Sequence, residues 1–252
     1  MTMLEDLSLA RLLADEAGKI LLHLRCDSSL RDLALGDAGD RAANAYLMRT
    51  LRAQRPHDGL LSEEETDNAA RLSKSRVWII DPLDGTREYR EGRADWAVHI
   101  ALCVDGAPHV CAVSLPSKDA LFTTGDGTKF HADAAVPPRR LRIAVSRTRP
   151  PKEAEQLVKR LSAAQIELVP MGSAGAKAMA VITGEVDAYI HAGGQREWDA
   201  AAPIGVALAA GLCATHLNGA AVRFNQVGAR TEDYLIAPSA VHAYLLANLR
   251  SD

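Results

Sequence analysis

The sequence predicts a mixed α/β fold in which helices and sheets form layers, with an α+β first half and an α/β second half. In the first half, two long amphipathic segments precede a series of strand patterns, whereas strand and helix patterns alternate throughout the second half. The chain has 252 residues, of which 48% are hydrophobic and 24% charged, so it can bury a large core. In a layered fold of this kind we expect a functional site where the halves meet.

The first half is expected to begin with two helices and to continue with short strands. Apolar residues at helical spacing fill residues 1–25, and a second such pattern ends at Pro56. A later alternating segment reaches Asp105-Gly106, a turn signal that predicts a hairpin. The expected elements are helices at residues 1–25 and 40–55 and strands at residues 77–80, 96–104, 110–115 and 121–130, the last with a turn at residues 125–127.

Proline pairs at residues 137–138 and 150–151 enclose one strand and mark a seam between the halves. We therefore expect two lobes in one compact unit, an α+β lobe of residues 1–138 and an α/β lobe of residues 139–252. The elements expected after the seam are strands at residues 141–146, 166–170, 187–191, 214–217 and 234–237 and helices at residues 152–162, 174–183, 199–210 and 239–249.

Charge, hydropathy and cysteine content argue against several classes of protein. The formal net charge is −3 and the basic residues are dispersed, so binding to a nucleic-acid polymer is not expected. No apolar stretch is long enough to span a membrane, and the N-terminal segment does not resemble a signal peptide. Four cysteines without CxxC spacing fit reduced thiols in a cytoplasm. Cys103 and Cys111 could face each other across the hairpin, but packing in the core is the preferred interpretation.

Residues 77–86, VWIIDPLDGT, place two aspartates directly after an apolar strand pattern. One interpretation is a turn, since Asp, Pro and Gly are common there. The other is a metal site. Because Pro82 fixes the backbone, the carboxylates of Asp81 and Asp84 can converge with the carbonyl of the intervening Leu83, and Mg²⁺ prefers such oxygen ligands. The spacing alone leaves both interpretations open.

The neighbouring residues fit a phosphate ligand. Gly85 has no side chain to obstruct one, the amides of Gly85 and Thr86 could open a helix that faces a phosphate, and the Thr86 hydroxyl can orient water. Further carboxylates stand near the ends of expected elements, namely Asp40, Glu63 and Asp199. Each has a structural alternative, because Asp is a common helix N-cap and acidic runs are usually solvated.

Three motifs together resemble the inositol monophosphatase superfamily of Mg²⁺-dependent, lithium-sensitive phosphatases. They are SEEE at residues 62–65, DPLDGT at residues 81–86 and WDAAA at residues 198–202, and residues 172–190 are similar to the family's substrate-side segment. The resemblance covers nearly the whole chain. It implies a layered αβαβα sandwich of the inositol monophosphatase and fructose-1,6-bisphosphatase type, and a phosphatase that uses two to three Mg²⁺ ions.

The resemblance also implies metal ligands. Glu63, Asp81 and the Leu83 carbonyl would hold one ion, and Asp81, Asp84 and Asp199 would hold a second. Leu83 replaces the commoner isoleucine, a change that a backbone ligand tolerates.

Catalytic roles follow from the same resemblance. Asp40 matches the family's aspartate that works with the motif threonine, here Thr86, and this pair would orient and deprotonate the attacking water. A third, weaker Mg²⁺ would bind near Glu63 and Asp40, and the amides of Gly85 and Thr86 would hold the phosphate. The implied reaction is in-line attack of water on phosphorus without a phosphoenzyme.

Residues around the motifs resemble the CysQ-type 3′(2′),5′-bisphosphate nucleotidases of this family, above all their actinobacterial members. The likeness lies in REY at residues 87–89, in EWD at residues 197–199 and in Ala192, which stands where animal-type enzymes have an inositol-binding glutamate. It implies 3′-phosphoadenosine 5′-phosphate (PAP) as substrate, with AMP and phosphate as products. Inositol 1-phosphate and fructose 1,6-bisphosphate are the alternative substrates. The non-enzymatic alternative is a sensor that binds a phosphorylated ligand without hydrolysis.

On the substrate side, Gly172, Ser173 and Ala174 would line the leaving group, and Lys177 or Arg196 would meet the second phosphate. Lys177 has an equally weighted alternative as a lysine on a helix surface.

Several other residues are expected to be structural. His99 lies in an apolar strand pattern, so a core histidine is preferred to a ligand. His191 and Gln195 are expected to be packed or to face solvent, and Trp96 and Trp198 are expected to pack. Many members of the family are homodimers, but fold-level analogy identifies no interface in this chain.

Overall fold

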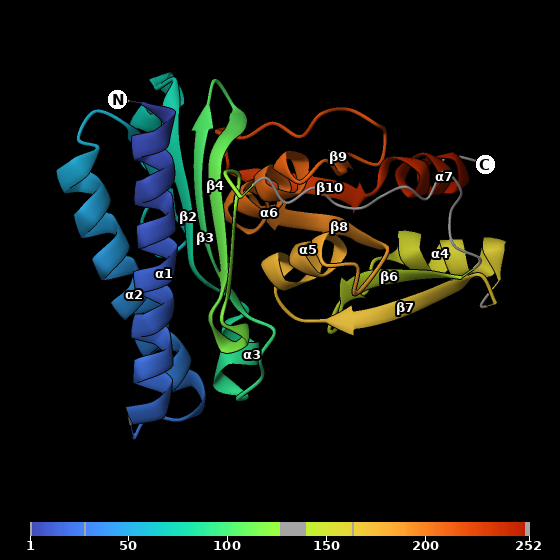
Figure 1. The fold of residues 1–252 in the computed structure, drawn as a ribbon, viewed down its shortest axis with the longest axis horizontal. Helices are drawn as coiled ribbons and strands as arrows, with labels where there is room; N and C mark the ends of the chain where they lie inside the picture. Colours follow the sequence, from blue (N-terminus) through green and yellow to red (C-terminus); the bar gives the residue numbers. More distant parts are fainter. Residues whose placement is uncertain (1, 28, 127–139, 163, 250–252) are drawn as a thin grey trace.

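The computed structural model describes residues 2–27, 29–126, 140–162 and 164–249, which form two five-stranded sheets with helices between and outside them (Figure 1). In order across the molecule, the layers are α1 (Met3–Asp27) with α2 (Asp32–Gln54), the first sheet, α5 (Ala174–Ile182) with α6 (Glu197–Ala209), the second sheet, and α4 (Lys152–Leu161) with α7 (Ser239–Leu249). This order confirms the predicted αβαβα sandwich.

The first sheet carries the outer helices α1 and α2 on one face. Its strands, in spatial order, are β1 (Gly59–Ser62), β2 (Arg76–Asp84), β3 (Ala97–Val104), β4 (Ala107–Leu115) and β5 (Ala120–Thr123). β1 runs parallel to β2, and the other neighbours are antiparallel. Leucines of both helices, including Leu13 and Leu47, form one buried cluster with Trp78 of β2. The two helices therefore bury the apolar face that their amphipathic sequence pattern predicts.

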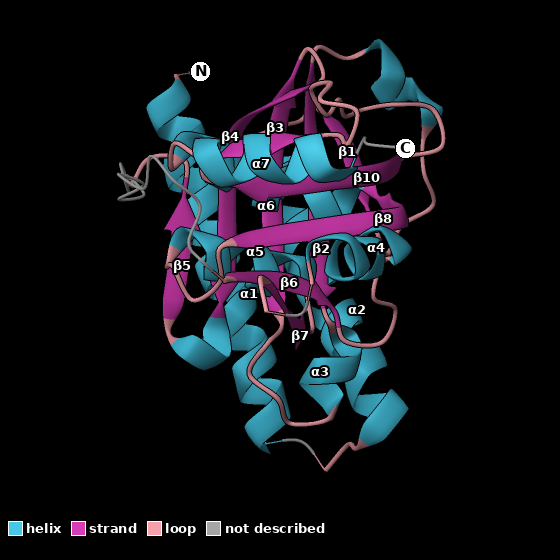
Figure 2. Cartoon of the chain, turned by 90° about the vertical axis from the view of Figure 1, so that its right-hand side faces the viewer, coloured by secondary structure: helices cyan, strands magenta, loops and turns pink. Residues whose placement is uncertain are grey.

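The second sheet has the order β7-β6-β8-β10-β9. Its strands are β6 (Leu141–Ser146), β7 (Ile166–Met171), β8 (Ala188–Arg196), β9 (Cys213–Thr215) and β10 (Arg230–Ala237). β6 is parallel to β7 and β8, whereas β10 is antiparallel to β8 and β9. α4 and α7 cover its outer face (Figure 2) and share a buried cluster with its strands.

The middle layer joins the two halves of the chain. Every residue of α5 is buried, and α6 is buried along most of its length, as expected for helices that are apolar on all sides. α6 lies very close to β4, since a Cβ added to Gly205 would lie 2.2 Å from Cys111 Sγ. The resulting core contains residues from both predicted lobes.

The two central cysteines belong to this middle core. Cys103 and Cys111 are buried, and burial raises the pKa of both thiols. The β3–β4 register pairs Cys103 with Pro108 and Cys111 with Ala101, so the two thiols are not opposite each other. Core packing is confirmed, and the facing pair across the hairpin is wrong.

Helix α2 differs from the prediction in a way that matters for the site. It begins at Asp32 rather than at residue 40, so Asp40 lies inside the helix, and the expectation that Asp40 starts or caps it is wrong. A Cβ at Gly36 would lie 2.8 Å from Thr86 Cγ2, and a Cβ at Gly39 would lie 3.1 Å from a carbon of Tyr89. These glycines permit close packing against the site, which outweighs their low helix propensity.

Most other differences concern strand lengths. β2 continues through Asp84 instead of ending at residue 80, β8 and β10 pair over a longer ladder than predicted, and β1 is an additional strand. β5 ends at Thr123. Gly127 of the predicted turn and the proline pair at residues 137–138 lie outside the described residues, so the lobe boundary stays a prediction. None of the helices in the described ranges is long and apolar enough to cross a bilayer.

Candidate active site

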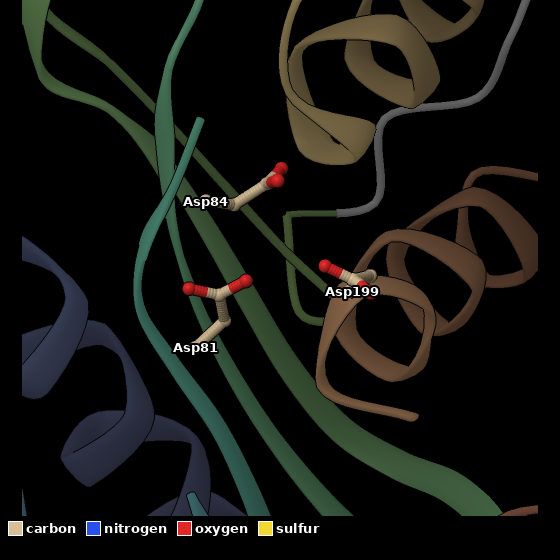
Figure 3. Close-up of side chains that lie close together, drawn as sticks. All are labelled: Asp81, Asp84 and Asp199. Atoms are coloured by element: carbon tan, nitrogen blue, oxygen red, sulfur yellow. The ribbon is translucent and has the colours of Figure 1, made fainter. Parts of the chain in front are cut away.

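Three aspartates from two distant motifs come together between the sheets. Asp81 and Asp84 lie at the end of β2, and Asp199 lies in the first turn of α6. One carboxylate oxygen of each lies within 4.8 Å of the other two. Figure 3 shows the three side chains converging from the strand and from the helix. The structure thus brings together three of the residues named as metal ligands in the sequence analysis.

An irregularity at the end of β2 directs its two aspartates. Asp81 pairs with His99 of β3, and pairing resumes at Asp84 after a register shift. Pro82, which has no backbone N–H to donate, lies within this shift. The Leu83 amide donates to Asp81 Oδ1 at 3.0 Å, a hydrogen bond between two residues of the irregular segment. The strand therefore does not stop before the aspartates but is distorted around them.

Gly85 makes the turn out of β2. Its φ of +87° lies in the left-handed region, which favours glycine, and the short helix α3 (Thr86–Arg90) follows, as the sequence predicts. A Cβ at this position would lie 3.3 Å from Ser173 Cβ and 3.4 Å from the Asp95 carbonyl oxygen. Glycine is therefore favoured by the backbone conformation and by the close approach of Ser173.

Asp84 is hydrogen-bonded to residues of the second half of the chain. Its Oδ2 accepts hydrogen bonds from the Ser173 hydroxyl and, at 2.9 Å, from the Gly175 amide. His99 Nε2 lies 3.2 Å from the same oxygen, while His99 Nδ1 lies 3.1 Å from the Trp198 carbonyl oxygen. Burial raises the pKa of Asp84, but His99, Lys177 and Ser173 together outweigh it and lower that pKa to about 2. His99 is thus a core histidine, as expected, and it links β3 to both motifs.

Asp81 and Asp199 carry carboxyl groups whose ionised forms are disfavoured in this cluster. Asp81 Oδ2 is buried and accepts no hydrogen bond from the described residues. Burial, with Glu63 and Asp84 nearby, raises the pKa of Asp81 well above its usual range. Burial and Asp84 raise the pKa of Asp199 to about 6. A cluster of buried carboxylate oxygens with an orphan acceptor fits a hard divalent cation, which would supply the missing positive charge.

Asp199 also takes part in capping the N-terminus of α6. The helix begins at Glu197, so Asp199 is its third residue rather than its N-cap. Asp199 Oδ2 accepts a hydrogen bond of 2.8 Å from the Arg196 amide, which completes a capping box. This bond fixes the carboxylate at the helix end that faces Asp84.

The two other predicted metal ligands lie beside this cluster. Glu63 follows β1 and is exposed, and its backbone amide donates to the Ile80 carbonyl oxygen at 3.3 Å. Although the residue as a whole is exposed, desolvation of its carboxyl group and the charge of Asp199 raise the pKa of Glu63 to about 7. The Leu83 carbonyl accepts a hydrogen bond of 3.1 Å from the Thr86 hydroxyl. Metal binding by Glu63 and by the Leu83 carbonyl stays a prediction.

The predicted catalytic pair is adjacent. Thr86 Oγ1 lies 3.4 Å from Asp40 Oδ2. Burial, followed by the charges of Glu64 and Glu63, raises the pKa of Asp40 to about 8. Asp40 Oδ1 has no hydrogen-bond partner in the described part of the chain. A carboxylate with this pKa can take up a proton near neutral pH.

A cleft of about 1160 Å³ opens onto the cluster and is lined by residues from both halves of the chain. The predicted substrate-side residues all line it: Gly85, Thr86, Gly172, Ser173, Ala174, Lys177 and Arg196. The sequence analysis missed the segment of residues 146–153, which carries Arg147 and Arg149, and it missed Arg230. The SRTR run before the proline pair was an available signal for the segment, whereas Arg230 has no local signal.

The Lys177 side chain is buried, and its ammonium group is hydrogen-bonded. Its side chain is buried in α5, and Nζ donates to the carbonyl oxygens of Gly172 and Ser173 at 2.9 and 2.6 Å. The ammonium lies 5.1 Å from the ring centroid of Tyr189. Burial lowers the pKa of Lys177 to about 8. The alternative of a helix-surface lysine is wrong, and the observed contacts hold the backbone of the substrate-side segment.

The neighbouring polar residues of β8 have mixed roles. The Gln195 side chain accepts a hydrogen bond of 2.7 Å from the Tyr234 hydroxyl, and the His191 ring packs against Tyr234 at a centroid distance of 5.4 Å. Both residues also line the cleft. Arg196 is exposed, donates to the Gly228 carbonyl at 3.1 Å and lies with its guanidinium 5.6 Å from the Trp198 ring centroid.

Comparison with known proteins agrees with this architecture. The model of a family described as "Inositol monophosphatase family" matches residues 9–251. A 3′-phosphoadenosine 5′-phosphate phosphatase of Mycobacterium leprae is 47% identical over 98% of this chain and 94% of its own length. A protein of the same description from Mycobacterium tuberculosis is 51% identical over 92% of this chain and 88% of its own.

Solved structures resemble the whole fold. An inositol monophosphatase from Zymomonas mobilis superposes with a TM-score of 0.79 at 23% identity and covers 100% of both chains. CysQ from Bacteroides thetaiotaomicron superposes with a TM-score of 0.79 at 24% identity, covering 91% of this chain and 96% of its own. At these identities the likeness concerns the fold.

Proposed function

The chain belongs to the inositol monophosphatase family, and we propose that it is a Mg²⁺-dependent phosphomonoester hydrolase that removes the 3′-phosphate of PAP to give AMP and phosphate. The observation that carries the proposal is the convergence of Asp81, Asp84 and Asp199 in a cleft lined by both lobes. The mycobacterial relatives named as 3′-phosphoadenosine 5′-phosphate phosphatases support the choice of substrate.

Two to three Mg²⁺ ions would be held by the acidic cluster. Asp81, Asp84 and Asp199 would supply most ligands, with Glu63 and the Leu83 carbonyl completing one site. When bound, the ions would offset the repulsion among these carboxylates, polarise the phosphoryl group and lower the pKa of water. The orphan Asp81 Oδ2 and the raised pKa of Asp199 fit this assignment.

The remaining catalytic work falls to Asp40 and Thr86. The Thr86 hydroxyl would orient the attacking water, and Asp40 Oδ2, 3.4 Å from Thr86 Oγ1, would receive its proton through that contact. The amides of Gly85 and Thr86 would hold the phosphate undergoing attack. On the leaving-group side, Gly172, Ser173 and Ala174 would line the nucleoside, and Lys177 or Arg196 would meet its second phosphate.

The proposal also covers the class of ligand, the oligomeric state, the cellular location and the division into lobes. The ligand is a small phosphorylated molecule rather than a nucleic-acid polymer or a membrane, and a homodimer is compatible with the fold family. The buried, unpaired thiols fit a cytoplasmic location. The first and second sheets, with their outer helices, would form two lobes divided near residue 138.

The alternatives are less well supported. Ala192 lines the cleft, and its methyl group cannot accept hydrogen bonds from inositol hydroxyls. A sensor without hydrolytic activity has no need of the adjacent Asp40 and Thr86.

The test is phosphate release with Mg²⁺, measured as kcat/KM for PAP, inositol 1-phosphate and fructose 1,6-bisphosphate under one set of conditions. We expect a clear preference for PAP and loss of most activity in Asp84→Asn. A preference for inositol phosphate would overturn the substrate assignment. Binding without release of phosphate from any substrate would favour the sensor.

A further inference from the structure

Two arginines face each other across the second sheet. The β8–β10 ladder pairs Arg196 directly with Arg230, and both residues line the cleft that contains Asp84 and Asp199. The strands lie side by side in Figure 2. Directly opposite residues of an antiparallel pair have Cβ atoms about 5 Å apart, and like charges at such positions are destabilising. The sheet therefore places two basic residues directly opposite each other at the wall of the cleft.

Neither arginine is neutralised by the protein. Across the described ranges, no carboxylate lies within ion-pair distance of Arg196 or Arg230, whereas Arg142 binds Asp187 and Arg147 binds Glu88. In the described part of the chain, the Arg196 guanidinium donates to one carbonyl oxygen, that of Gly228 at 3.1 Å, and lies 5.6 Å from the Trp198 ring centroid. A guanidinium has five N–H donors in a planar fork, so most donors of this pair have no protein acceptor among the described residues.

The surroundings leave room for an anion beside the pair. Gly193 and Gly194, which precede Gln195 in β8, have φ values of +97° and +78°, and a Cβ at either would meet no atom within 4 Å. The backbone of β8 therefore faces open space at these two glycines. Lys177, the other cation considered for a second phosphate, already donates to two backbone carbonyls.

We propose that Arg196 and Arg230 form the subsite for the second, uncleaved phosphate of the substrate. The inference rests on the proposed function, since it assumes that the phosphate undergoing attack lies at the acidic cluster. The Arg196 amide donates to Asp199 Oδ2 at 2.8 Å, so the arginine pair and the cluster adjoin in one cleft. A phosphate dianion between two guanidinium groups receives charge-assisted, bidentate hydrogen bonds and removes their mutual repulsion.

The test compares two substrates that differ only in the second phosphate, PAP and adenosine 3′-monophosphate. We expect the ratio of their kcat/KM values to fall about tenfold in Arg196→Gln, about tenfold in Arg230→Gln, and further in the double variant. Arg223→Gln is the matched control, because Arg223 is exposed and does not line the cleft. Arg149→Gln tests another arginine that lines the cleft. An unchanged ratio in the double variant, or a loss confined to Arg149→Gln, would overturn the proposal.

A binding measurement separates this inference from the proposed function. AMP retains the second phosphate and lacks the one undergoing attack, so its affinity relative to adenosine can be measured by calorimetry without turnover. We expect the double variant to lose at least about tenfold of this preference. Failure of wild-type protein to hydrolyse either substrate would refute the proposed function, and the calorimetric result would still decide the subsite: equal preference for AMP in wild type and double variant would refute it.

Discussion

Neutralising one carboxylate of the acidic cluster should stabilise the metal-free protein. Asp199→Asn keeps an oxygen acceptor for the Arg196 amide and removes one negative charge. The pKa of Asp199 is raised from 3.8 to about 6, chiefly by burial and next by Asp84. A shift of this size corresponds to about 3 kcal/mol of unfavourable free energy when the group is ionised in the folded state.

The direction of the pKa shift of Asp199 determines the pH range of this effect. A carboxyl group with a raised folded-state pKa binds more protons in the folded state, so stability falls as pH rises from about 4 to about 6 and the deficit is complete above that range. In chelator at pH 7.5 we therefore expect Asp199→Asn to unfold with a free energy up to about 3 kcal/mol higher than wild type. At pH 4 the difference should largely disappear.

Urea unfolding followed by tryptophan fluorescence, with chelator and with saturating Mg²⁺, measures this effect. Mg²⁺ should stabilise wild type and stabilise the variant much less. Asp119→Asn is the control, because Asp119 is exposed and has a φ of +49° that asparagine tolerates. The reasoning would be refuted if Asp199→Asn were less stable than wild type in chelator at pH 7.5, or if Mg²⁺ stabilised both proteins equally.

Three further perturbations test other parts of the structure. Thr86→Val should lower kcat for PAP by about 100-fold or more while the Mg²⁺-induced rise in Tm persists, because the hydroxyl orients water and is not a proposed metal ligand; unchanged turnover would count against this role. Gly205→Ala should lower the free energy of unfolding by about 1–3 kcal/mol through overpacking, and Cys111→Ala in the same chain should restore part of it, since the added Cβ would lie 2.2 Å from the sulfur. Lys177→Met should cost about 1–3 kcal/mol in urea unfolding, because two backbone carbonyls lose their donor; a variant as stable as wild type would contradict this account.

The extent of sequence-based prediction depended on how local each feature is. Asp81 and Asp84 are separated by two residues, so their convergence follows from the short motif and the proline between them. Asp199 is remote in sequence, and only the resemblance to a known family associated it with the others. Arg230 was missed because its place opposite Arg196 follows from a bulged strand register that no sequence pattern reveals.

The errors have a common physical origin. Asp40 was expected at the start of a helix because the apolar pattern was followed only over residues 40–55, yet the helix begins at Asp32, and Gly36 and Gly39 allow it to approach α3 and its neighbours. Lys177 was weighed as a surface residue because lysine is rarely buried, yet all of α5 lies between two sheets. In both cases tertiary packing overrode a local preference, and in both the exception lies beside the site.

The cleft combines two opposite kinds of electrostatic stress. At one end one oxygen each of Asp81, Asp84 and Asp199 lies within 4.8 Å of the others, and in the wall nearby Arg196 and Arg230 are paired with no carboxylate at ion-pair distance among the described residues. Each arrangement lowers the stability of the unliganded protein, and each would be relieved only by a ligand of the opposite charge. Divalent cations satisfy the first arrangement and a phosphate satisfies the second. A substrate that carries two phosphates can engage both, since one phosphate meets the cations at the cluster and the other meets the arginines. Because a bisphosphate relieves the repulsion at both places and a monophosphate at only one, the cleft is selective for the bisphosphate.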